Sequence, residues 1–234
     1  EAEGQTDSNF HADAIDYNQR LYRFMQWGRN GTVFAEFSSL TAWHLRYVLG
    51  SWHSDSDLQW AQSNVEQKYK EPNSIGMAAR MVTYRLHNDK GVSVQEGLRF
   101  YDGQIATMPV IHSYGGVCGA VSKFGASACQ SFGVPAMPVA QPGHCALIWR
   151  ASGGKWELEN GNGGWNHSTM HVGIQRTWFE LGVWSDQAGV IPVMEQALSR
   201  MENYLLGEQL RWAVKILGQG PASEHTLQEL RLAL

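Results

Sequence analysis

The 234-residue sequence predicts a domain of the α+β class, in which a cysteine-bearing helix packs on a small antiparallel sheet and further helices precede and follow it. Through about the first hundred residues, apolar side chains recur at helical spacing. After Gly103, glycine and proline become frequent and short apolar runs of strand length replace the helical pattern. From about Gln175 the helical spacing returns. We expect one domain over 13–234, with its core within about 100–190, after a loose polar segment over 1–12.

Composition excludes several classes of partner. Hydrophobic residues make up 43% of the chain and charged residues 17%, which is typical of a globular protein. The formal net charge of −4 gives no electrostatic reason to expect nucleic acid or an anionic membrane surface as a partner. No apolar run approaches the roughly 18 residues that a membrane span requires. Ten tryptophans can build core, and some can line an open cleft where flat rings suit sugar or peptide.

Two short motifs favour a secreted glycoprotein. Asn30-Gly31-Thr32 and Asn166-His167-Ser168 are N-glycosylation sequons, so Asn30 and Asn166 are the candidate glycan acceptors. The first residues, Glu1-Ala2-Glu3, resemble the remnant of secretory-leader processing in a yeast expression system, and we do not expect them to belong to the folded domain. We therefore expect an extracellular location.

Five helices are expected before Gly103, over 13–27, 39–49, 55–69, 74–86 and 93–100. The first would turn one apolar face inward, made of Ile15, Leu21, Tyr22 and Met25. Ser39 can cap the second, which Gly50 ends. Ser93 and Glu96 have the spacing of a capping box at the start of the fifth.

Three strands are expected in the central part, over Val134–Val139, Ala146–Trp149 and Lys155–Glu159. Gly153-Gly154 is a suitable hairpin turn between the last two. Amphipathic helices are expected again over 194–217 and 223–234.

Cys118 is the candidate nucleophile. It follows two glycines in the segment YGGVCG and begins a helical pattern that runs to Phe132, with Gly133 as its stop. A cysteine at a helix N-terminus lies at the positive end of the helix dipole, which favours the thiolate. The neighbouring glycines would let backbone N–H groups reach a bound carbonyl and form an oxyanion hole. Taken alone, a cysteine is more often a small buried hydrophobe.

His144 and Asn160 are the candidate base and its orienter. His144 starts an apolar strand in the segment PGHCALIW, where it can face a neighbouring helix N-terminus. Asn160 ends the next strand in the segment KWELEN, and its side chain could accept a hydrogen bond from the imidazole. Asn160 also begins Asn-Gly-Asn-Gly-Gly, so a plain turn residue is the alternative.

These segments resemble the transglutaminase-like superfamily, which is related to papain-like thiol hydrolases and includes peptide:N-glycanases. The resemblance rests on GGVCG, on ACQSFGVPAMPV at the end of the helix, on GHCALIW and on KWELEN, and it covers about a fifth of the chain. It implies a transglutaminase-like core with Cys118 as nucleophile, His144 as base and Asn160 as orienter. Many members have aspartate where this chain has Asn160, although papain-like enzymes use asparagine.

The expected activity is thiol-dependent hydrolysis or acyl transfer on an amide of a peptide, glutamine or glycopeptide, without a cofactor. Substrate contacts are expected from Tyr114, Gly116, Gln141 and Trp165, and a side-chain oxyanion donor from Gln104, Tyr114 or Gln141.

Cys129 and Cys145 are not expected to pair. Cys129 lies three helical turns after Cys118 and should point into the helix–sheet interface. Cys145 follows His144 and so faces the other side of its strand, which disfavours a bridge to Cys129. No Cys-x-x-Cys spacing is present, and adjacent strand residues cannot easily bind one ion, so no metal site is expected.

Two alternative functions remain open. Glu157 and Glu159 lie on one face of a strand at about the spacing that glycosidases use, but Trp156, Leu158 and Asn160 share the other face, so the glutamates would point away from the imidazole. A non-catalytic glycan-binding module with a tryptophan-rich cleft is the second alternative.

Overall fold

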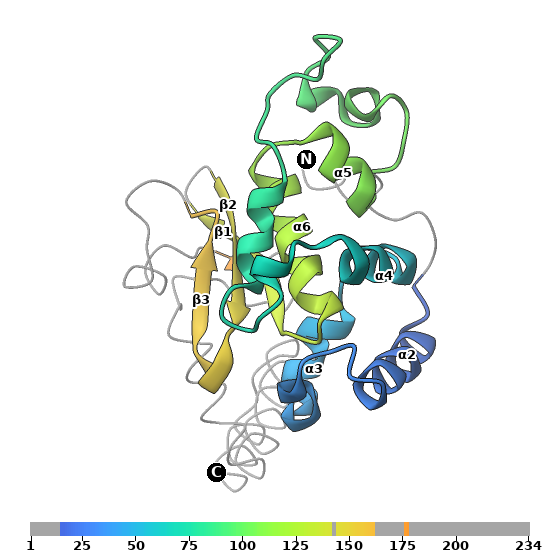
Figure 1. Cartoon of the computed structure of the whole chain (residues 1–234). Helices are drawn as coiled ribbons and strands as arrows, with labels where there is room; N and C mark the ends of the chain where they lie inside the picture. Colours follow the sequence, from blue (N-terminus) through green and yellow to red (C-terminus); the bar gives the residue numbers. More distant parts are fainter. Residues whose placement is uncertain (1–14, 142–143, 162–175, 178–234) are drawn as a thin grey trace, which may run out of the picture. The chain divides into compact units, whose positions relative to one another are not determined.

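The computed structural model describes residues 15–141, 144–161 and 176–177. The chain divides into two compact units, Glu1–Ala188 and Gly189–Leu234, and every described residue belongs to the first. This unit is α+β, as expected, with helices packed on a small antiparallel sheet (Figure 1). The helices expected over 194–217 and 223–234 lie outside the described residues, so the expectation of one domain over 13–234 stays a prediction.

The described elements are short. The α-helices are α2 (Tyr17–Arg29), α3 (Ala42–Leu49), α4 (Asp55–Asn64), α5 (Met108–Tyr114) and α6 (Cys118–Ser131). The 3₁₀-helices are η1 (Ala35–Ser39), η2 (Gln67–Tyr69), η3 (Ile75–Met81), η4 (Val94–Tyr101) and η5 (Ser152–Gly154). The strands are β1 (Ala136–Gln141), β2 (His144–Arg150), β3 (Trp156–Glu159) and β4 (Arg176–Thr177).

The inward face of α2 differs from the one predicted. Its buried residues are Arg20, Phe24 and Trp27, whereas Tyr22 is 69% and Met25 43% exposed. The reason is Arg20, whose buried guanidinium donates to the Asp55 carboxylate and to the main-chain carbonyls of Leu49, Ser51 and His53. A fully hydrogen-bonded arginine can be buried, and hydrophobic periodicity does not reveal that.

Helix starts follow capping chemistry, with one correction. The N-cap of α3 is Thr41, whose hydroxyl accepts from the His44 amide, and not Ser39, which ends η1. The capping box of Ser93 and Glu96 is present as predicted at the start of η4. Side-chain oxygens at these positions satisfy amides that have no partner within the helix.

The segment that follows Ser74 forms less helix than predicted. Only η3 forms there, and Tyr84 and Leu86 are exposed. The main chain of this segment pairs elsewhere, because Tyr84 bridges with Gly116 and His87 bridges with Ser93. The predicted helix over 55–69 likewise ends early, at Asn64.

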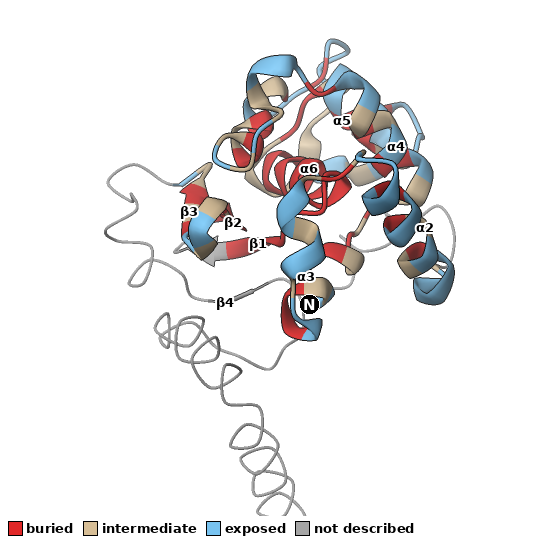
Figure 2. Ribbon diagram, turned by 60° about the horizontal axis from the view of Figure 1, so that its bottom comes forward, coloured by how far each residue is buried: buried red, intermediate tan, exposed pale blue. Residues whose placement is uncertain are grey.

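Helix α6 is the centre of the described unit. Every residue from Ala120 to Ser131 is buried, which Figure 2 shows as a continuous red helix among the others. The helix contacts β1 and β2 on one side and η3, α3, α4 and α5 on others. Its small residues allow close approach: a Cβ on Gly125 would lie 2.5 Å from Leu147 Cδ2 and 2.7 Å from Ala79 Cβ.

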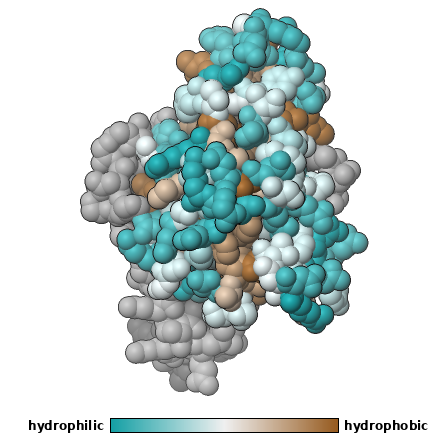
Figure 3. Space-filling view, in the orientation of Figure 1, coloured by the Kyte–Doolittle hydropathy of each residue, from teal (hydrophilic) through white to brown (hydrophobic). Residues whose placement is uncertain are grey.

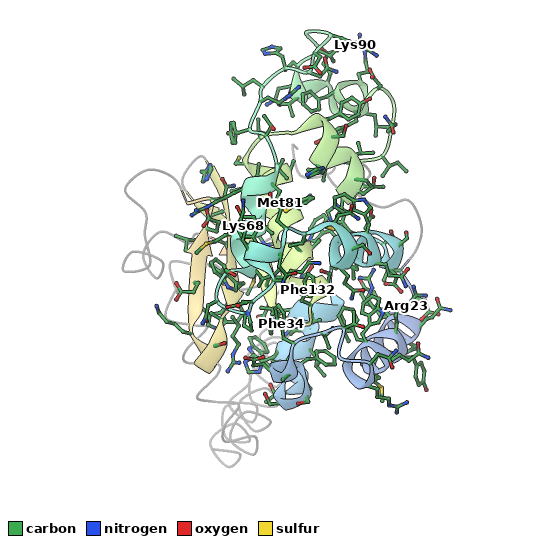
Figure 4. The ribbon with its side chains drawn as sticks, viewed as in Figure 1. Arg23, Phe34, Lys68, Met81, Lys90 and Phe132 are labelled. Carbon is green, nitrogen blue, oxygen red and sulfur yellow. The ribbon has the colours of Figure 1, made fainter. Side chains whose placement is uncertain are left out.

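The sheet has the strand order β3-β2-β1-β4, with all neighbours antiparallel. Gln141 pairs with His144 at one end of the β1–β2 pair, and the glycines of η5 connect β2 to β3 as predicted. The far end of α6 is anchored by Phe132, whose ring stacks on Phe34 at 5.3 Å (Figure 4). The predicted strands are confirmed, except that β3 ends at Glu159, so that His144 is the first residue of β2 and Asn160 lies just after the end of the neighbouring β3.

Candidate active site

Cys118 is the first residue of α6 and is only partly buried, whereas Cys129 and Cys145 are fully enclosed. All three are free thiols, as expected. Burial raises the pKa of the Cys129 thiol well above its ordinary value, which makes that cysteine unreactive. Cys118 is therefore the accessible thiol of the chain.

The glycines before Cys118 fix the loop in place. The Gly116 amide donates to the Thr83 carbonyl at 3.1 Å, and the Gly116 carbonyl accepts from the Arg85 amide at 3.0 Å. Gly115 has a φ of 78°, and a Cβ on it would lie 2.3 Å from the Thr83 oxygen, so the position requires glycine. The amide of Gly116 is thus used inside the protein, while its predicted contact with substrate stays a prediction.

The start of α6 supplies other donors. Val117 is the N-cap and makes no side-chain cap bond, so the first-turn amides of Cys118 and Gly119 have no partner within the helix or from a cap. A Cβ on Gly119 would meet no atom within 4 Å, so the surroundings of this residue are uncrowded on that side. The first turn of α6 thus has backbone donors that neither the helix nor its cap uses.

His144 is the first residue of β2 and is half-buried. Its Nε2 lies 2.5 Å from the main-chain carbonyl oxygen of Asn160. A carbonyl oxygen only accepts hydrogen bonds, so Nε2 carries the proton of the neutral ring. The other nitrogen, Nδ1, is then unprotonated and has the lone pair that a general base needs.

The hydrogen bond from the imidazole goes to the main chain of Asn160 and not to its side chain, which corrects the predicted role. Asn160 has a left-handed φ of 52°, and the two N–H groups of its Nδ2 are shared among the Cys118 carbonyl at 3.2 Å, the Ser122 hydroxyl at 2.8 Å and the Cys145 carbonyl at 3.0 Å. Two carbonyls among these partners fix which end of the amide is the nitrogen. Asn160 therefore touches His144 with its main chain and Cys118 with its side chain.

Tyr114 belongs to a polar group at the surface, four residues before Cys118. Its hydroxyl donates to Asp102 at 2.9 Å and accepts from the Gln104 amide at 3.2 Å. The hydrogen bond to Asp102 raises the pKa of the Tyr114 hydroxyl. Hydrogen bonds from Lys90 and, to a smaller extent, from Tyr114 lower the pKa of the Asp102 carboxyl. Tyr114 and Gln104 are thus within reach of one another at the end of α5, and their predicted substrate contacts stay predictions.

The remaining candidates are in part outside the described residues. The Gln141 side chain, Trp165 and Asn166 are not described, and the Asn30 sequon lies at the exposed end of α2.

On the described face in Figure 3, hydrophilic residues cover most of the surface. No helix within the described ranges has the length and apolar character that crossing a membrane requires.

The glutamates of β3 are in ion pairs. Glu159 accepts from Arg80 through both carboxylate oxygens, at 3.1 and 2.9 Å, and Glu157 pairs with Lys155 at 2.6 Å. The strand alternates as predicted, with Trp156 and Leu158 buried. The two carboxylates therefore lie on the opposite face of β3 from the buried pair.

The expectation that the chain has no metal site stays a prediction. Among the described residues, no three His, Cys, Asp or Glu side chains are grouped so that they could hold an ion. His167 and His171 have the four-residue spacing of zinc-binding pairs and lie outside the described part.

Ser122 is the site residue that sequence reasoning missed. Its only signal was its position four residues after Cys118, which puts both on one face of α6.

Comparison with family models, with curated proteins and with solved structures gives no match to this chain.

Proposed function

We propose that the protein is a cysteine-nucleophile hydrolase or acyltransferase with a transglutaminase-like core, acting on an amide of a peptide, glutamine or glycopeptide. The observation that carries the proposal is the bond between His144 Nε2 and the Asn160 carbonyl, made by a residue whose side chain also binds the Cys118 carbonyl. Asn160 thus links the main chain of the residue that carries the accessible thiol to an imidazole whose unprotonated Nδ1 can accept a proton. The accessibility of Cys118 and the uncrowded side of Gly119 support the same role.

The first half-reaction would form a thioester. His144 Nδ1 takes the thiol proton, and the Cys118 sulfur attacks the amide carbonyl carbon. The Cys118 and Gly119 amides hold the negative charge that develops on the carbonyl oxygen. The carbon–nitrogen bond then breaks, and His144 returns its proton to the leaving amine. The acyl group stays on sulfur.

The second half-reaction would release the acyl group. Water, or a second amine, gives a proton to His144 and attacks the thioester carbon. The carbon–sulfur bond breaks, and the thiolate recovers the proton from His144. Hydrolysis and acyl transfer differ only in the molecule that attacks here. A secreted location fits this proposal, since the sequons at Asn30 and Asn166 matter only outside the cytosol.

Alkylation tests the pairing of thiol and base without a known substrate. Wild-type protein is treated with limiting iodoacetamide at pH 7, and labelled peptides are quantified by mass spectrometry. We expect labelling at Cys118, faster than for a free thiol with the ordinary pKa of about 8.5. His144→Gln should lower the rate by about ten-fold or more, because general-base help is worth about 10²–10⁴-fold.

Two controls and one turnover measurement complete the test. Cys118→Ser should abolish native-state labelling, since Cys129 and Cys145 are buried. With p-nitrophenyl acetate, an acetyl thioester should accumulate on Cys118 and form more slowly in His144→Gln. A Cys118 rate equal to that of a free thiol and unaffected by His144→Gln would overturn the proposal. Full turnover of a glycoside by Cys118→Ser, lost in Glu157→Gln or Glu159→Gln, would favour the glycosidase alternative.

A further inference from the structure

Ser122 connects the three parts of the candidate site although its side chain has no place in the chemistry. It lies on α6, one turn after Cys118, and it is fully buried. Its hydroxyl donates to the Cys145 carbonyl at 2.9 Å and accepts from Asn160 Nδ2 at 2.8 Å. A hydroxyl has one proton and two lone pairs, so it can fill both roles at once.

The hydrogen bonds around Ser122 form a closed network. Asn160 Nδ2 also donates to the Cys145 carbonyl at 3.0 Å and to the Cys118 carbonyl at 3.2 Å. Cys145 directly follows His144, and Cys118 is the candidate nucleophile. The network therefore ties the first turn of α6, the start of β2 and the end of β3 to one another.

We propose that Ser122 is a positioning residue, which holds His144 and the Asn160 carbonyl in register with Cys118. This inference rests on the proposed function for its effect on reactivity, but its geometric part stands on the network itself. Without the hydroxyl, the Cys145 carbonyl loses the Ser122 donor and Asn160 loses its shortest acceptor. The Asn160 main chain could then rotate, and the imidazole would lose its fixed acceptor.

Two substitutions test the network from its two sides. Ser122→Ala removes the hydroxyl alone. Asn160→Gly removes the amide side chain while it keeps the carbonyl oxygen and a residue that tolerates the left-handed φ of 52°. The control is Ser131→Ala, at an equally buried serine of α6 whose hydroxyl donates to Ala128 of the same helix at 2.7 Å.

The first readout is the imidazole N–H proton resonance of His144, assigned by its absence in His144→Gln. In wild type, the bond to the Asn160 carbonyl should protect this proton from exchange and shift it downfield. Ser122→Ala and Asn160→Gly should lose or broaden the resonance, while Ser131→Ala keeps it. Circular dichroism establishes that each variant is folded, and if Ser122→Ala does not fold, Asn160→Gly decides.

The second readout is the pH profile of Cys118 alkylation. Both network variants should react about ten- to a hundred-fold more slowly than wild type at pH 7, since a misplacement of about 1 Å can cost 10²-fold. A folded Ser122→Ala that keeps the resonance and the wild-type rate would overturn the inference. If instead wild-type Cys118 has ordinary reactivity, the proposed function fails, and the resonance alone still decides whether Ser122 holds His144.

Discussion

At the scale of single residues, the carbonyl oxygen of Asn160 restricts the imidazole of His144 to one neutral tautomer. A carbonyl dipole stabilises an imidazolium less than a carboxylate does, because it carries only partial charge. In exchange, the side chain of residue 160 is free to hold Cys118, Ser122 and Cys145 together. Asn160 thus binds the His144 imidazole through its main chain and the Cys118 carbonyl through its side chain.

Asn160→Asp should therefore be harmful here, although aspartate is the usual residue in the family that the motifs resemble. A carboxylate cannot donate, and it would face two carbonyl oxygens and a hydroxyl that now accept from Nδ2. We expect a loss of about 1–3 kcal/mol in the free energy of unfolding, the cost of leaving buried polar groups unpaired. Urea denaturation followed by tryptophan fluorescence measures it.

The deficit of Asn160→Asp should shrink as the pH falls, because the substituted carboxyl takes up a proton and can then donate one hydrogen bond. Wild type, measured over the same pH range, is the control. Equal stability of the two proteins at pH 7 would mean that the side chain at 160 does not need to donate.

That Cys118, His144 and Asn160 lie together could be predicted from sequence, but the part of Ser122 and the atoms through which these residues bond could not. The segments around Cys118, His144 and Asn160 carried enough local pattern to select all three residues. From sequence, two interpretations of Asn160 were open: it could orient the His144 imidazole, or it could be a plain turn residue. In the structure it has a turn conformation and belongs to the site, because a φ of 52° directs its carbonyl, not its amide, to His144.

At the scale of elements, the tight fit of α6 results from its small side chains. Gly125 lies where the helix crosses β2 and η3, and any Cβ there would overlap Leu147 and Ala79. A helix held this close to the sheet brings its first turn, and hence Cys118, within hydrogen-bonding reach of the residues that follow β3. The position of Cys118 therefore depends on packing seven residues further along the helix.

Gly125→Ala should destabilise the protein although alanine is the better helix former. The helix propensity gain is about 1 kcal/mol, but inserting a methyl group into a filled interface costs about 1–3 kcal/mol. The methyl would meet Ala79 Cβ at 2.7 Å, and a short side chain on η3 has no room to turn away. We expect a lower urea midpoint with an unchanged m-value.

Gly119→Ala is the matched control for Gly125→Ala, since it lies in the same helix and its Cβ would meet nothing within 4 Å. Its free energy of unfolding should equal that of wild type or exceed it slightly. If both alanine variants were equally stable, packing at Gly125 would not limit the approach of α6 to the sheet.

At the scale of the whole molecule, the α+β class, the central helix and the strand pairing could be predicted because local signals agree there. The glycine turns, the capping box at Ser93 and the apolar strand runs each mark their own element. The structure of the first hundred residues was harder to predict, because contacts with residues far away in the sequence determine which side chains are buried and where the helices end. Arg20 is buried through acceptors that lie 29–35 positions away, and the segment at Tyr84 pairs with Gly116 instead of continuing a helix.

Alkaline pH should unfold the protein partly through Tyr101. Burial raises the pKa of this phenol to about 12 from 10.0, and the residue is only 5% exposed. Between pH 10 and 12 the unfolded chain releases the phenolic proton while the folded chain keeps it, so the free energy of unfolding falls as pH rises. Two pKa units correspond to about 2.7 kcal/mol.

Tyr101→Phe isolates this contribution from those of the other tyrosines and of Cys129. The variant should lose about 2–3 kcal/mol less than wild type between pH 9 and pH 12 in urea denaturation. Parallel pH profiles for the two proteins would contradict the burial of a neutral phenol at this position.

The link between Asn160 and His144 also sets an order of events during synthesis. The thiol and the imidazole leave the ribosome first, and the acceptor for the imidazole comes sixteen residues after it. Until β3 has paired with β2, His144 lacks this acceptor and Cys118 lacks the amide that binds its carbonyl. On the proposed function, a nascent chain that has made only the helix and two strands would therefore lack the reactivity of the complete site. Completion of the third strand is the step that assembles the site.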